Sequence, residues 1–120
     1  MTIIANVVVA AVALLHIYIL VLEMFLWTSS RGRAVFGTDR EFAKASAPLA
    51  ANQGLYNGFL AAGLIWGLVA DDVVGFPVKG FFLSCVIIAG IYGAATVNRR
   101  ILFVQSVPAG IGLILVLISR

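Results

Sequence analysis

Two ionisable side chains stand in the first long apolar stretch of this sequence. His16 and Glu23 are seven residues apart, which on an α-helix places them about two turns apart on nearly the same face. A carboxylate at the centre of a bilayer costs about 2.5 to 3.5 kcal/mol, so an ionisable group inside a span marks a site by default. We predict that Glu23, together with His16, forms a catalytic centre. The alternative is a carboxyl that is structurally paired or reaches the interface.

A second group of polar side chains interrupts the apolar stretch from residue 51 to 63. Successive helical residues turn by about 100°, so four polar side chains share one face: Asn52, Gln53, Tyr56 and Asn57. An amide without a partner is costly in a bilayer, and we expect this face to turn toward other helices or a wet cavity. An interhelical clamp, at about 1 kcal/mol per hydrogen bond, is the alternative to a ligand site.

Depth along the expected helices indicates which polar groups could meet. At a rise of about 1.5 Å per residue, five side chains lie within roughly 6 to 10 Å of one surface: Glu23, Asn52, Gln53, Tyr92 and Gln105. We expect a polar pocket that opens toward the cytoplasm and narrows inward. The predicted ligand-binding residues are Asn52, Gln53, Tyr56, Asn57, Tyr92 and Gln105.

No metal site is expected. Two helical turns separate the attachment points of His16 and Glu23 by about 10 Å, whereas metal–ligand distances are about 2 Å. HExxH and CxxC motifs, paired-carboxylate spacings and a Gly-rich phosphate loop are also missing from the sequence. Any cofactor stays unknown. Cys85 is the single cysteine, so no disulfide forms within the chain.

The composition shows what must surround these side chains. Of 120 residues, 62% are hydrophobic and 11% are charged, whereas about a quarter of the residues of a soluble domain are charged. Uncharged runs cover residues 1–22, 45–70, 80–98 and 101–119. The length of each run reaches or nearly reaches the number of residues, about 20, that a helix needs to cross a bilayer core. We predict an all-α polytopic membrane protein, a bundle of four transmembrane helices.

The expected spans form one domain over residues 1–120. Their bounds are about 3–27, 46–70, 77–98 and 100–119. Ser46 and Pro48 have the pattern of an N-cap and a first helical turn, and Pro77 marks the turn into the third span. Thr38 and Glu41 have the spacing of a capping box, which predicts a short interfacial helix that carries Phe42. Pro108 should kink the fourth span.

Basic residues predict the orientation. The first and third loops hold six of them, namely Arg31, Arg33, Arg40, Lys44, Arg99 and Arg100, and the opposite side holds Lys79 and Arg120. By the positive-inside rule, the first and third loops face the cytoplasm and both termini face out. We therefore expect a multi-pass membrane protein with both termini outside. Its partners should be the lipid bilayer and a small amphipathic ligand, not nucleic acid.

Small residues predict close helix contact. Gly54, Gly58 and Ala62 follow one another at intervals of four on a face separate from the amides. Such a ridge lets a second backbone approach, either within the bundle or between protomers. We expect a homo-oligomer.

Several segments together resemble a known family. They are His16-Ile17-Tyr18 with Glu23-Met24-Phe25 and Trp27, Arg31-Gly32, Phe36-Gly37, Ala51 to Gly63, Phe81-Phe82-Leu83, Ala89-Gly90-Ile91-Tyr92-Gly93, and Gln105 with Pro108-Ala109. The chain resembles, over nearly its whole length, the bacterial membrane proteins of domain-of-unknown-function family 1304. The resemblance implies an integral protein of the bacterial inner membrane and no particular activity.

The sequence is compatible with three functions, and it does not decide whether the chain is an enzyme. In the first, the cluster binds or transforms a small amphipathic ligand, with Glu23 as acid, base or cation partner. The span layout is similar to that of the membrane-associated enzymes of eicosanoid and glutathione metabolism, by analogy alone. In the second, the chain is a proton-coupled exporter that resembles the small multidrug resistance transporters. In the third, it is a structural accessory subunit.

Overall fold

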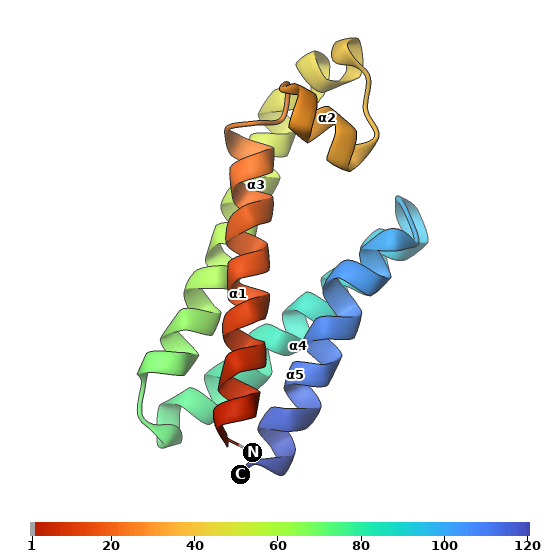
Figure 1. Cartoon of the computed structure of the whole chain (residues 1–120). Helices are drawn as coiled ribbons and strands as arrows, with labels where there is room; N and C mark the ends of the chain where they lie inside the picture. The colour runs from red at the N-terminus through yellow and green to blue at the C-terminus, as the bar shows by residue number, and fades with distance from the viewer. Residues whose placement is uncertain (1) are drawn as a thin grey trace. The chain divides into compact units, whose positions relative to one another are not determined.

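The computed structural model describes residues 2–120, and every regular element in them is helical (Figure 1). Five are α-helices and one is a π-helix, which we label η1. In chain order they are α1 (Thr2–Met24), α2 (Ser30–Phe36), α3 (Arg40–Val69), α4 (Asp72–Thr96), η1 (Leu102–Ser106) and α5 (Val107–Ile118). The all-α prediction is confirmed for this part of the chain.

The chain forms two compact units. The first unit joins the N-terminal residues up to Leu14 to Leu60–Arg120, and the second unit is Leu15–Phe59. Helices α1 and α3 each contribute to both units. The single domain predicted over 1–120 stays a prediction.

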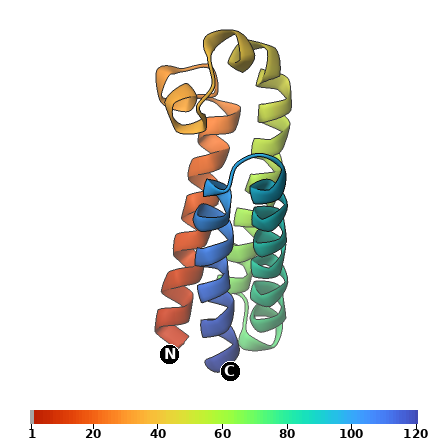
Figure 2. The ribbon, with the colours of Figure 1, turned by 90° about the vertical axis from the view of Figure 1, so that its right-hand side faces the viewer.

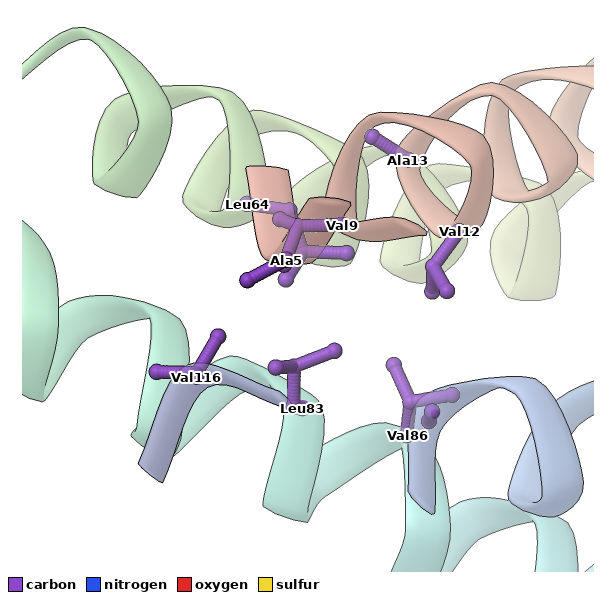
Figure 3. Packing of buried hydrophobic residues seen from close by; sticks show 9 residues of the cluster. Ala5, Val9, Val12, Ala13, Leu64, Leu83, Val86 and Val116 are labelled. Atoms are coloured by element: carbon purple, nitrogen blue, oxygen red, sulfur yellow. The ribbon is translucent and has the colours of Figure 1, made fainter. Parts of the chain in front are cut away.

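The core of the first unit is a set of small and branched side chains at helical spacing. Ala5, Val9 and Val12 recur along α1 at the intervals of one helix face, and each is at most 1% exposed. Leu83 of α4 is also fully buried, and these side chains point toward one another (Figure 3). Leu64 of α3 and Ala109 and Val116 of α5 complete the cluster. The apolar faces of four helices are therefore buried against one another.

Helices α4 and α5 form an antiparallel hairpin in the first unit (Figure 2). The turn that joins them is tight, and in it Asn98 Oδ1 accepts a hydrogen bond from the Arg100 N–H at 2.8 Å. Ser106 Oγ then donates to the Ile87 carbonyl at 2.9 Å. A Cβ at Gly90 would overlap the Ser106 side chain, so glycine is what allows the two helices to approach here.

A π-helical turn lies directly before Pro108, where we expect a kink; the kink itself stays a prediction. The Val107 N–H bonds to the Leu102 carbonyl, five residues back, and Pro108 follows in the first turn of α5. Proline has no N–H to give to the carbonyl four residues before it, so a change in the helical ladder is expected just before it. Single π-helical turns inside helices are often found at functional sites.

In the second unit, α2 folds back on the end of α1. Ser29 caps α2 by accepting from the Gly32 N–H at 3.1 Å, and Gly37 ends it in the left-handed region with φ 69°. A Cβ at Gly32 would overlap the Leu26 carbonyl and lie 3.0 Å from the Trp27 carbonyl oxygen. Backbone atoms cannot move aside as side chains can, so only glycine permits this fold-back.

Trp27 connects the three elements of this region. Its Nε1 donates to Ser46 Oγ at 3.0 Å, and its ring lies 4.9 Å from that of Phe36 between centroids. One side chain therefore holds the end of α1 in contact with helix α2 and with the start of α3.

The start of α3 differs from the prediction. The helix begins at Arg40 and not at Ser46, because Asp39 Oδ1 accepts from the Phe42 N–H at 2.7 Å and so caps it. Phe42 thus lies in the first turn of α3, and the predicted separate helix with a Thr38 cap is wrong. Ser46 Oγ donates instead to the Phe42 carbonyl at 2.6 Å.

The start of α4 is also earlier than predicted. Asp71 caps it by accepting from the Val74 N–H at 3.2 Å, and Pro77 lies inside the helix. In both helices an aspartate cap sets the start, and a proline farther along is accommodated within the helix.

Two helices in the described residues are long and apolar enough to cross a membrane, α1 and α4. The apolar segment Leu102–Ile118, formed by η1 and α5, is shorter. Helix α3 has 30 residues but is not among the two, since amides and small residues interrupt its apolar side chains. Four transmembrane spans stay a prediction.

Candidate functional site

The second unit brings together Glu23 at the end of α1 and Asn57 in the middle of α3. Asn57 Nδ2 donates to Glu23 Oε1 at 2.6 Å and also contacts the Gln53 carbonyl at 3.3 Å. Glu23 is only 6% exposed. A buried carboxyl thus has an amide partner on the neighbouring helix, as buried polar groups require. We call these two residues the Glu23–Asn57 pair.

Glycines allow the two helices to come this close. A Cβ at Gly54 would lie 2.5 Å from Met24 Cγ and 3.3 Å from the Leu20 carbonyl oxygen. A Cβ at Gly58 would lie 2.7 Å from Leu20 Cδ1. The predicted helix contact is confirmed for these two positions. Ala62 is exposed, so its contact with another protomer stays a prediction.

The other polar residues of α3 do not reach Glu23. Asn52 and Gln53 are exposed, and so is Tyr56 at 59%, whose ring meets that of Phe59 edge-on. The amide that bonds to Glu23 is therefore Asn57 and neither Asn52 nor Gln53, the two amides that depth along the helices places at the level of Glu23. The reason is angular: Gly54 faces α1, and Asn57 lies only about 60° from it around the helix, whereas Gln53 lies about 100° and Asn52 about 160° away.

His16 is fully buried on α1, two turns before Glu23. The burial of both residues agrees with the shared face expected from their spacing. In the first unit, Tyr92 of α4 is 71% exposed and Gln105 of η1 is half-buried. Their participation in one site with Glu23 stays a prediction.

Two polar features were missed by the sequence reasoning. In the first unit, Lys79 Nζ donates to Asn6 Oδ1 at 3.0 Å, beside a cavity of about 280 Å³ whose lining includes Asp72, Lys79 and Arg120. In the second unit, Arg31 donates to the Tyr18 hydroxyl at 2.6 Å from Nη2 and 3.0 Å from Nε. Asn6 was a detectable signal, as a single amide within an uncharged run. No sequence spacing connects Tyr18 with Arg31.

The chemistry available to the Glu23–Asn57 pair is that of a carboxyl oriented by an amide. Such a group can accept a hydrogen bond, exchange a proton or pair with a cation. Among residues 2–120 no group of three or more His, Cys, Asp or Glu side chains is placed to hold a metal ion.

Comparison with known proteins relates the chain to a family. A family model described as "Protein of unknown function (DUF1304)" matches residues 10–117. The uncharacterized protein YpaA of Lactococcus lactis subsp. lactis (strain IL1403) is 32% identical over 116 residues, which cover 95% of this chain and 97% of YpaA. No solved structure matches.

Proposed function

The chain belongs to the DUF1304 family of proteins of unknown function, and we propose that it is a four-span membrane protein that binds a small amphipathic ligand at the Glu23–Asn57 pair. One observation carries the proposal. A carboxyl that is 6% exposed lies on a helix able to cross a membrane, and its one described partner is a neutral amide at 2.6 Å. Ionisable groups in spans are costly and mark ligand or proton sites.

The membrane assignment is supported by helix length and composition. Helices α1 and α4 are long and apolar enough to span, and α3, with 30 residues, reaches about 45 Å at 1.5 Å per residue. The hydrocarbon core is about 30 Å thick. With η1 and α5 as the last span, the chain would cross four times and lie in the bacterial inner membrane.

The exposed polar face of α3 indicates the kind of ligand. Asn52, Gln53 and Tyr56 are exposed on α3, at about 140°, 40° and 100° from Asn57 around the helix, so Gln53 is the one that adjoins the pair. In a bilayer these amides need polar partners. A ligand with a polar or cationic head and an apolar body would place its head at Glu23, where Gln53 is a further polar contact, and its body along the apolar helix surfaces. A second copy of the chain would cover the same face in a homo-oligomer.

Binding of tetraphenylphosphonium, an amphipathic cation, tests the proposal. We expect calorimetry of the detergent-purified protein to detect binding to the parent and its loss in Glu23→Gln, since the amide keeps the shape but cannot pair with a cation. Glu41→Gln is the matched control, because this carboxyl lies in the exposed first turn of α3. Equal binding by Glu23→Gln and the parent would refute the role of the pair.

The same carboxyl also fits a small proton-coupled exporter, the second candidate. Proton release during binding, measured as a pH change in weak buffer, would favour the exporter. Binding without proton release would favour a simple ligand site or an enzyme. Absence of both in a folded protein would favour the accessory subunit.

A further inference from the structure

Four basic side chains lie in the segment that connects α1 to α3 and in the start of α3. They are Arg31 and Arg33 of α2, and Arg40 and Lys44 in the first two turns of α3. Arg31, Arg40 and Lys44 are exposed, and Arg33 is half-buried. The same segment holds two acidic residues, Asp39 and Glu41, so a positive excess remains. We call the four side chains the basic surface.

The basic surface has a fixed position relative to the end of α1. Helix α2 is held there by Trp27, which bonds to Ser46 and packs on Phe36, and by the close packing of Gly32 on the α1 end. Arg31 reaches back to the Tyr18 hydroxyl, and its guanidinium carbon lies 5.8 Å from the Tyr18 ring centroid. If α1 crosses the bilayer, these tryptophan, tyrosine and arginine groups mark the depth of the headgroups.

Apolar side chains accompany the basic residues. Phe25 is 72% exposed, Phe42 is 57% exposed, and Val35 is also exposed. An element with exposed aromatic and basic side chains together is typical of a segment that lies at a membrane interface. The apolar groups would enter the acyl boundary while the cations stay among the headgroups.

Arg40 and Lys44 stand where they do not help their own helix. The N-terminus of a helix carries a partial positive charge, which favours acidic residues and disfavours basic ones. Asp39 already serves as an acceptor for the Phe42 N–H. An external anion would complement both the helix end and the two cations.

We propose that the basic surface binds the headgroups of anionic phospholipids. Clusters of four to eight basic residues next to a membrane helix attract anionic lipids, with about 1 kcal/mol for each Lys or Arg, or about fivefold in affinity. This inference requires α1 to lie in a bilayer and does not depend on the Glu23–Asn57 pair or its ligand.

Trp27 provides a direct reporter, because it lies within the region that positions the basic surface. The only other tryptophan is Trp66, so the experiment uses the full chain with Trp66→Phe, reconstituted in phosphatidylcholine vesicles. Equal small fractions of brominated phosphatidylglycerol or brominated phosphatidylcholine are then added. We expect stronger quenching of Trp27 by the brominated phosphatidylglycerol, and a loss of this preference as salt screens the exposed charges.

Arg40→Gln with Lys44→Gln should reduce the phosphatidylglycerol preference by about fivefold for each charge removed. These substitutions are expected to leave helicity intact, because neither cation favours the start of α3. Arg99→Gln with Arg100→Gln is the matched control, which removes the same charge from the loop between α4 and η1 and should leave the preference unchanged. Equal quenching by the two lipids in the parent, or a preference insensitive to salt, would overturn the proposal. An equal loss in the control pair would also overturn it, since it would reflect net charge alone.

Discussion

At the scale of single residues, the structure shows that Glu23 accepts a hydrogen bond from Asn57. The sequence indicates only that several amides lie near the level of this carboxyl. The sequence identified the carboxyl from its cost in an apolar run and the amides from their shared face. It could not choose among them, because the choice depends on which side of α3 faces α1. Gly54 and Gly58 decide this, and they leave Asn57 as the amide within reach of Glu23.

The Glu23–Asn57 pair makes a prediction for stability. Glu23→Gln should leave the fold intact, because Gln keeps an oxygen that can accept from Asn57. Glu23→Ala should lower the free energy of unfolding by about 1 to 3 kcal/mol, since the Asn57 amide loses its partner on α1 and keeps only the 3.3 Å contact with the Gln53 carbonyl of its own helix. In a double-mutant cycle with Asn57→Ala, we expect a coupling energy of about 0.6 to 1.7 kcal/mol, as for hydrogen bonds between membrane helices.

The cycle would be measured by unfolding of the purified protein in mixed micelles, followed by circular dichroism. Gln53→Ala is the control, because that side chain is exposed and its loss should change stability by less than about 0.5 kcal/mol. Strict additivity of Glu23→Ala and Asn57→Ala would mean that the hydrogen bond contributes nothing to the fold.

At the scale of elements, the contact between α1 and α3 depends on residues without side chains. A Cβ at Gly54 would meet three groups of α1, namely Met24 Cγ at 2.5 Å, Glu23 Cβ at 3.2 Å and the Leu20 carbonyl oxygen at 3.3 Å. A Cβ at Gly58 would meet only the flexible end of Leu20. Gly54→Ala should therefore destabilise the protein by about 1 to 3 kcal/mol, as overpacking does, and Gly58→Ala should cost less.

Gly80→Ala is the matched control for this pair. No atom lies within 4 Å of its Cβ position, and alanine is a better helix former than glycine by about 1 kcal/mol. We expect thermal unfolding in detergent to rank the variants with Gly80→Ala as the most stable, Gly58→Ala next and Gly54→Ala as the least stable. A reversed order of the Gly54 and Gly58 variants would show that the α1–α3 contact is different.

Helix existence was predictable, whereas helix starts were not. The four long apolar runs each correspond to a helix, since an uncharged run of that length has few alternatives. The starts of α3 and α4 were placed too late, because proline was given more weight than the aspartates that cap these helices. The short helix α2 was missed. It depends on Gly32 packing against backbone carbonyls, a tertiary contact that leaves no periodic pattern in the sequence.

At the scale of the whole molecule, charge along the chain is the remaining guide to orientation. The predicted topology assigns six basic residues to one side and two, Lys79 and Arg120, to the other. Four of the six lie in α2 and the first two turns of α3. Side-chain contacts do not separate the two sets, because Lys79 bonds to Asn6 and Arg120 lies 4.1 Å from the Phe76 ring centroid, and Arg31 of the larger set bonds to the Tyr18 hydroxyl. The difference between the sets is therefore their number.

This asymmetry predicts which residues face the cytoplasm. Alkaline phosphatase, active only outside the cytoplasm, should be active when fused after Arg120, because the positive-inside rule places the C-terminus outside. In a Cys85→Ser background, which removes the single native thiol, Ala34→Cys places a thiol on the exposed part of α2. A membrane-impermeant maleimide should label it only in opened cells. Asp72→Cys, exposed at the start of α4, is the control and should react in intact cells. Labelling of Ala34→Cys in intact cells would contradict the predicted topology, and it would place the basic surface at the outer leaflet.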